Sequence, residues 1–197
     1  MLDLKQQLDF VLELDKLKSV YRKAMVKSDN NRFENSAEHS WHIAMLAFTL
    51  HPYAEQPINL MRVVHMLLIH DIVEIDAGDK FAFAPQQELD GQQALEVAAA
   101  KRIFGLLPEQ QFNEMNNLWH EFEQVSSADA QFAKAMDRIA PLLQNMNNNG
   151  GSWAINNISK SQVIERNKYL KNLTPKLWDY AVQQIDIAVK NGWLIDR

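Results

Sequence analysis

The sequence predicts an all-α protein, a helical bundle in which residues 1–197 form a single domain. Glycine and proline are scarce, with six of each among 197 residues, and apolar residues recur at intervals of three and four, the period of an amphipathic helix. Hydrophobic residues make up 47% of the chain and charged residues 23%. This composition and length favour one substantial core rather than two domains.

Charge and composition narrow the functional classes. The net charge of −5 argues against a nucleic-acid polymer or an anionic membrane as partner. No apolar run approaches the roughly 20 residues of a membrane helix, and the first residues lack the layout of a signal peptide. Cysteine is absent, so any metal ion needs nitrogen and oxygen ligands. We expect a cytoplasmic protein.

The N-terminal segment predicts one helix and then a loop. Apolar residues from Leu4 onward keep a helical spacing, and we expect this helix to run to about Tyr21 or Arg22. A polar loop over Ser28–Arg32 follows.

A capping box opens the second helix. In Asn35-Ser36-Ala37-Glu38 the Asn side chain can accept a backbone hydrogen bond while Glu38 reaches back. His39 therefore lies in the first turn. This helix should end at His51-Pro52, because proline disfavours helical geometry in the residue before it.

The third helix carries an unusual cluster of charge. It should begin near Ile58 or Asn59 and lead into an apolar run that ends in His70-Asp71. At about 100° per residue, His70, Asp71 and Glu74 all face inward. Charged groups on an apolar segment need compensation, which a bound metal ion would supply. Gly78 ends the segment.

The remaining elements follow from the same periodicity. Residues 81–87 form a loop that could close over a site, and residues 147–151 form another. Asp137 lies beside the core face of a helix that begins near Ser126, and Pro141 should bend that helix. The core face is Phe132, Met136, Ile139, Leu143 and Met146. Further helices are expected over residues 88–104, 108–122, 161–170 and 175–191.

Taken together, these positions indicate a metal site, although each alone is common by chance. His39 and His42 share one side of a helix, and either could be a ligand. One of these two histidines, together with His70-Asp71 and Asp137, supplies a set of two imidazoles and two carboxylates. Such a set suits one divalent ion such as Mn, Fe, Co or Ni, with Mg or Zn as alternatives.

The order of three motifs along the chain provides a further clue. It resembles the HD-domain superfamily of metal-dependent phosphohydrolases, which are all-helical, through Glu38-His39-Ser40, His70-Asp71 and Asp137. Within it, the 5′-deoxynucleotidase branch is the most similar, through residues 34–40, 70–74 and 78–79. The resemblance implies that His39, His70, Asp71 and Asp137 hold the metal. His42 then becomes a core or supporting residue, and a homodimer is plausible within this family.

The resemblance also implies roles around the metal. Glu74 matches the catalytic acid, Asp79 a substrate contact and Arg22 a phosphate-binding arginine. Lys23 stands where the branch usually has tryptophan, so we expect it to affect sugar recognition. The segment after Asp79 departs from the branch as well, which leaves the choice between ribo- and deoxyribonucleotides open.

The sequence therefore predicts an enzyme that releases phosphate from a small phosphomonoester, most plausibly a nucleoside or deoxynucleoside 5′-monophosphate. Glu74 would orient water or protonate the leaving oxygen, and Arg22, with Lys23 or Arg32, would bind the phosphate. One alternative is a hydrolase of another phosphoester or of a signalling nucleotide. The other is a non-catalytic nucleotide-binding module.

Overall fold

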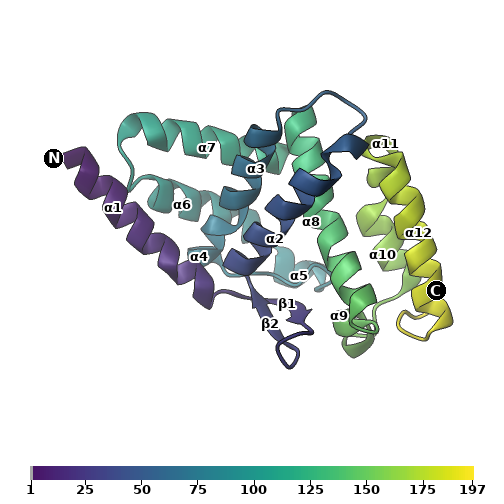
Figure 1. The fold of residues 1–197 in the computed structure, drawn as a ribbon. Helices are drawn as coiled ribbons and strands as arrows, with labels where there is room; N and C mark the ends of the chain where they lie inside the picture. The colour runs from purple at the N-terminus through teal and green to yellow at the C-terminus, as the bar shows by residue number, and fades with distance from the viewer. Residues whose placement is uncertain (1) are drawn as a thin grey trace.

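The computed structural model describes residues 2–197 and shows a helical bundle with one small hairpin (Figure 1). Helices α2 (Ser36–Leu50), α3 (Leu60–Ile69) and α8 (Ala128–Asn147) pack against one another at its centre. Around them lie α1 (Leu2–Leu14), α4 (Glu74–Ala77), α5 (Gln86–Leu89), α6 (Gln92–Phe104), α7 (Glu109–Gln124), α9 (Gly151–Ile155), α10 (Lys160–Asn167), α11 (Leu170–Leu173) and α12 (Pro175–Lys190).

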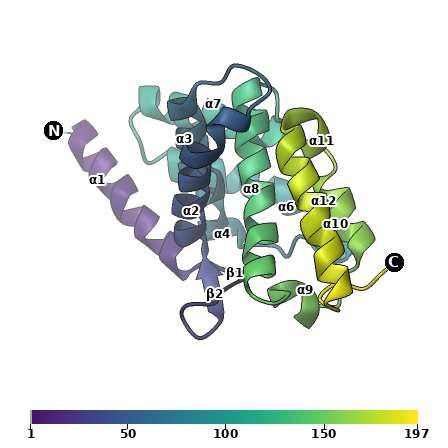
Figure 2. The same ribbon diagram turned by 45° about the vertical axis from the view of Figure 1, so that its right-hand side comes forward.

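The central helices separate two outer groups of helices. Helices α6 and α7 pack together, and α7 also packs against α3 and α8 (Figure 1). Helices α10, α11 and α12 pack along α8 at the opposite end of the molecule (Figure 1 and Figure 2). One connected core joins them, with Ile43, Leu67 and Met136 fully buried. No helix within residues 2–197 has the length and apolar character required to cross a membrane. The all-α prediction is confirmed, with one local exception.

That exception is a β-hairpin where the sequence predicted the end of the first helix. Helix α1 ends at Leu14, a 3₁₀ turn η1 spans Asp15–Ser19, and strand β1 (Tyr21–Val26) pairs antiparallel with β2 (Arg32–Asn35). The expected helix to Tyr21 or Arg22 is therefore wrong. Asn30 and Asn31 adopt φ values of 50° and 59° in the connecting turn, a conformation that asparagine tolerates well.

The capping box of α2 is confirmed. Asn35 Oδ1 accepts a hydrogen bond of 3.0 Å from the Glu38 backbone, and the Asn35 backbone donates at 3.2 Å to Glu38 Oε2. This cap fixes where α2 begins. It therefore also fixes the position of His39, which is fully buried.

Helix α3 does not continue through the His-Asp pair. It ends at Ile69, and a 3₁₀ turn η3 covers His70–Val73. The inward orientation is nevertheless confirmed, because His70 and Asp71 are both buried. The Trp119 indole donates a hydrogen bond of 3.1 Å to the His70 carbonyl, so this change of helix type leaves that carbonyl paired.

Elsewhere, the helix boundaries in the structure differ modestly from those predicted from the sequence. The helix expected over residues 88–104 is split, because Gly91 adopts a left-handed φ of 81° between α5 and α6. The helix expected over 161–170 ends at Asn167, and α9 occupies the end of an expected loop. Of the expected α8 core face, Phe132, Met136 and Ile139 are buried, while Leu143 and Met146 pack half-buried at its edge.

Candidate active site

Three of the predicted ligands come together at the centre of the bundle. His39 from α2, His70 from η3 and Asp137 from α8 each offer one ligand atom, and these atoms lie within 4.8 Å of one another. His39 Nε2 is 3.2 Å from Asp137 Oδ1, and His70 Nε2 is 3.9 Å from the same oxygen. The bundle thus brings together residues separated by up to 98 positions in the chain.

The His70 ring has one nitrogen available that could bind a metal ion. Nδ1 lies 2.8 Å from the Leu67 carbonyl oxygen, and because a carbonyl only accepts, Nδ1 must carry the proton. In the neutral ring Nε2 then has a lone pair. This buried atom has no hydrogen-bond partner, although Asp71 Oδ1 is 2.9 Å away. Electron-rich atoms facing one another in a buried site fit a cation, so the donor set suits a metal ion.

The Nδ1 atom of His39 faces the carboxylate of Glu34, and neither His39 Nδ1 nor Glu34 Oε2 has a hydrogen-bond partner. Glu34 Oε2 lies 3.4 Å from His39 Nδ1, on the far side of the ring from Asp137. Gln144 in turn donates a 2.6 Å hydrogen bond to Glu34 Oε1. A carboxylate behind a histidine typically fixes the ring for metal binding. Glu34 belongs to the motif of residues 34–40, just before the capping box, but no role of its own was predicted for it from the sequence.

Protonation and metal binding compete at His39. Burial lowers the pKa of His39, and so does Arg22, but the carboxylates of Asp137 and Glu34 outweigh both and raise the pKa above its usual value. The negative charge that favours a proton on this ring also favours a divalent ion. Acid should therefore release the metal.

Asp71 lies beside this cluster and is shared with an arginine. Its Oδ2 accepts a 2.5 Å hydrogen bond from Arg22, which projects from β1. Burial alone would raise the pKa of Asp71, but the neighbouring side chains of His70 and Arg22 lower it below its usual value. Asp71 is therefore ionised and in reach of the metal site, although it is not in the group of three that converges within 4.8 Å.

Arg22 also faces the two remaining predicted carboxylates. Its Nη1 is 3.8 Å from Glu74 Oε1 and 3.8 Å from Asp79 Oδ1. The three surrounding carboxylates raise the pKa of Arg22 despite the opposing effect of burial. In this structure its charge is thus compensated by protein groups.

Glu74 has the character of a proton-transfer group. Burial and the neighbouring Asp71 raise its pKa well above the usual value. Ser36 Oγ, from the first turn of α2, donates a 2.5 Å hydrogen bond to Glu74 Oε2. Glu74 is therefore held in one position, one turn beyond His70, and its raised pKa suits a group that donates or accepts a proton.

Two neighbouring cavities meet at this site. One of about 180 Å³ contains His70, Asp71, Glu74 and Asp137. The other, which we call the aromatic cavity, has a volume of about 80 Å³ and is lined partly by Phe81, Phe83 and Trp153. Residues that line both are Arg22, Asp79, Lys80, Arg138 and Arg166.

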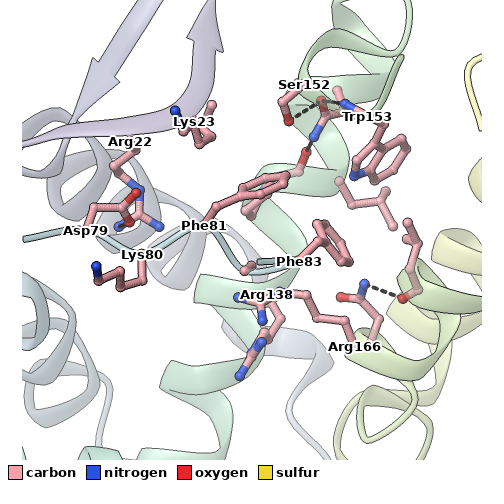
Figure 3. Close-up of a pocket in the computed structure, with 17 residues that line it drawn as sticks. Arg22, Lys23, Asp79, Lys80, Phe81, Phe83, Arg138, Ser152, Trp153 and Arg166 are labelled. Carbon is pink, nitrogen blue, oxygen red and sulfur yellow. Dashed lines mark hydrogen bonds and ion pairs between the residues drawn. The ribbon is translucent and has the colours of Figure 1, made fainter. Parts of the chain in front are cut away.

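The second cavity is formed partly by the loop of residues 78–85, between α4 and α5. This loop overlaps the one predicted over residues 81–87 that could close over a site, although α5 already begins at Gln86. Phe81 and Phe83 extend from this loop toward Trp153 (Figure 3). An apolar wall beside a charged site is typical of pockets that bind a small organic ligand. Trp153 lies on α9, a helix that the sequence did not predict.

Several other candidates lie away from the ligand cluster. His42 is half-buried and stacks on Trp41, with ring centroids 6.3 Å apart, beside a different cavity. Arg32 pairs with Asp29 and Glu38, so it is not free to bind phosphate at this site. Lys23 lines the aromatic cavity, and its ammonium group is 5.5 Å from the centroid of the Phe33 ring.

Comparison with known proteins gives consistent matches. Residues 14–178 match the model of the HD domain family. The human 5′-deoxynucleotidase HDDC2 is 32% identical over 139 residues, which cover 70% of this chain and 65% of the relative. The bovine 5′-deoxynucleotidase HDDC2 is 31% identical and covers the same shares of the two chains. The chain thus spans just under two thirds of these relatives' length.

Solved structures extend the match to nearly the whole chain. A predicted metal-dependent phosphohydrolase from Magnetospirillum magnetotacticum MS-1 is 43% identical, with a TM-score of 0.91, over 98% of this chain and 95% of the other. An HD-domain phosphohydrolase from Listeria innocua shares the fold, with a TM-score of 0.60 at 17% identity, over 93% and 85% of the two chains.

Proposed function

Because this chain belongs to the HD domain family, we propose that it is a divalent-metal-dependent phosphohydrolase. Its proposed substrate is a small phosphomonoester, a nucleoside or deoxynucleoside 5′-monophosphate. The observation that carries this proposal is the convergence of His39, His70 and Asp137 beside Glu74. The relatives named 5′-deoxynucleotidase support the substrate class.

His39, His70, Asp71 and Asp137 would hold the metal ion. His70 offers a lone pair on Nε2, and the two carboxylates supply the charge that a divalent ion requires. A divalent ion bound there would lower the pKa of water and polarise a phosphoryl oxygen. Mn, Co, Fe, Ni, Mg and Zn are all compatible with these nitrogen and oxygen donors.

The chain's own residues position the substrate and move protons. Glu74, held by Ser36, orients the attacking water or donates a proton to the leaving ester oxygen. Arg22 contacts the phosphate once the metal shares the charge of Asp71. Asp79 and Lys23 line the cavity that would receive the organic part of the substrate. Lys23 is the residue that we expect to influence the choice of sugar.

A phosphate-release screen tests this function. Purified protein is incubated with ribo- and deoxyribonucleoside 5′-monophosphates and with Mn, Co, Ni, Mg or Zn. We expect metal-dependent release of phosphate from at least some of these nucleotides. Turnover confined to other phosphoesters or to signalling nucleotides would favour a different HD hydrolase. Nucleotide binding without any turnover would favour a non-catalytic module.

We also propose that the protein works as a cytoplasmic homodimer. Trp41, Met45 and Phe48 form one exposed stripe on α2, with 64%, 46% and 43% of their surfaces accessible. Exposed apolar stripes of this kind often lie at protein–protein interfaces. Light scattering on the wild type and on Met45→Glu tests this: a dimer that dissociates in the variant supports the proposal, and a monomeric wild type contradicts it.

A further inference from the structure

Two arginines at the junction of the cavities lack acidic partners. Among residues 2–197, neither Arg138 of α8 nor Arg166 of α10 has a nitrogen within 4.0 Å of a carboxylate oxygen. The Nε atom of Arg138 is buried and has no hydrogen-bond partner. Arg22 differs, because three carboxylates already surround it. Half-buried charge without a paired carboxylate is costly, so this pair favours an anionic ligand.

The two guanidinium groups also affect each other. Burial, and then the charge of Arg138, lower the pKa of Arg166 to about 10. The Arg166 guanidinium lies 5.8 Å from the centroid of the Phe83 ring, which forms part of the wall of the aromatic cavity. An anion between the two arginines would relieve their repulsion and pair with both.

The location of the pair matches a substrate phosphate. Both arginines line the cavity that contains Glu74 and the proposed metal ligands, and both line the aromatic cavity as well. Figure 3 shows them at the end of the aromatic cavity, near Phe83. A ligand with its organic part against the aromatic side chains would therefore place an attached phosphate beside Arg138 and Arg166.

We propose that Arg138 and Arg166 clamp the phosphate group of the substrate and select phosphate monoesters over diesters. This inference rests on the proposed function. It adds the two residues that would restrict the substrates to phosphate monoesters. A phosphate monoester is close to doubly charged at neutral pH, whereas a diester carries one charge. Two partnerless arginines match the doubly charged group, and arginine binds phosphate oxygens in a bidentate manner.

Binding of inorganic phosphate to the metal-loaded protein tests the clamp by calorimetry. Arg166→Gln and Arg138→Gln should each weaken phosphate binding about tenfold or more, the scale of a lost charged hydrogen bond. Arg166→Lys should recover part of the affinity. Arg62→Gln is the matched control, since Arg62 pairs with Glu121 and Asp129 on another surface. Unchanged phosphate affinity in both glutamine variants would overturn the clamp.

A purely structural role for Arg166 predicts a different result. If the arginine only stabilised α10, then Arg166→Gln would lower the melting temperature. The clamp predicts an unchanged or raised melting temperature, because the substitution removes a charge that is half-buried and has no paired carboxylate. Loss of phosphate affinity together with a large loss of stability in both glutamine variants would therefore count against the clamp.

A second assay tests selectivity. The ratio of kcat/KM for p-nitrophenyl phosphate over bis-p-nitrophenyl phosphate should fall about tenfold in Arg166→Gln, and an unchanged ratio would contradict the selectivity. The two proposals can fail separately. Hydrolysis by the wild type with normal phosphate binding in the variants would refute the clamp alone. Phosphate binding that depends on both arginines, without hydrolysis of any ester, would refute the function and support an anion site.

Discussion

The ligand cluster and the aromatic cavity are built in contrasting ways. His39 and His70 are buried on or beside central helices, where His39 faces Glu34 and His70 faces the Leu67 carbonyl. The aromatic cavity shares one wall with the central helix α8, but its other walls come from β1, the loop between α4 and α5, and the short helices α9 and α10. Substitutions in the cluster should therefore reduce metal binding and turnover, whereas substitutions in the cavity should change which substrates bind.

The largest effect is expected at Asp137. Asp137→Asn keeps the size of the side chain but removes the carboxylate that His39 and His70 face. Phosphate release should fall by at least about a thousandfold, or roughly 4 kcal/mol in activation free energy, with unchanged helical circular dichroism. Asp76→Asn is the control, since Asp76 pairs with Arg102 on the surface. Near-normal turnover in Asp137→Asn would place the chemistry elsewhere.

A smaller loss is expected at Glu34, which contacts His39 rather than the proposed metal position. Glu34→Gln should weaken metal binding by about 10- to 100-fold, the usual effect of removing the carboxylate behind a metal-binding histidine. Competition with a metal indicator measures this affinity. An unchanged affinity would show that His39 needs no such orientation.

The aromatic cavity should respond differently. Phe83 packs edge to face on Phe81, with ring centroids 5.6 Å apart, and its removal takes away apolar contact. Phe83→Ala should raise the KM for nucleotides about tenfold, corresponding to roughly 1.4 kcal/mol, with little change in kcat or in inorganic phosphate binding. A fall in kcat with an unchanged KM would contradict the assignment of substrate binding to the aromatic cavity and of turnover to the ligand cluster.

The ionisable side chain of Glu74 should lower the stability of the metal-free protein at neutral pH. Because burial and Asp71 raise its pKa in the folded state, the wild type loses stability as pH rises from the unfolded pKa toward the folded one. Glu74→Gln should thus stabilise the metal-free protein at neutral pH by on the order of 1 kcal/mol. The gain should vanish below about pH 4, where both forms are neutral. Urea denaturation across pH measures this, and destabilisation at neutral pH would contradict it.

The smallest effect is expected at Lys23, on the exposed side of β1. Lys23→Trp should shift the ratio of kcat/KM values between ribo- and deoxyribonucleotides by about threefold, less than 1 kcal/mol. Steady-state kinetics with matched nucleotide pairs measures this ratio. If the ratio does not move, Lys23 has no part in sugar recognition.

The same contrast explains what the sequence could predict. His70 and Asp137 were placed by helical periodicity, and His39 and His42 by a capping box and helical spacing, which are local signals; the resemblance to the HD-domain superfamily then selected His39 over His42. The partnership of Arg138 with Arg166 and the position of Trp153 depend on how α9 and α10 lie against α8. No local pattern encodes that packing. Arg22 was identified but assigned to a helix, because the hairpin that orients it depends on pairing between β1 and β2.

Metal analysis combined with reconstitution tests the central claim most directly. Gently purified protein should contain about one divalent ion per chain, held by His39, His70, Asp71 and Asp137. Chelation should abolish phosphate release, and added Mn or Co should restore it. Protein that contains no metal and stays inactive toward every nucleoside monophosphate after Mn or Co is added would contradict the account.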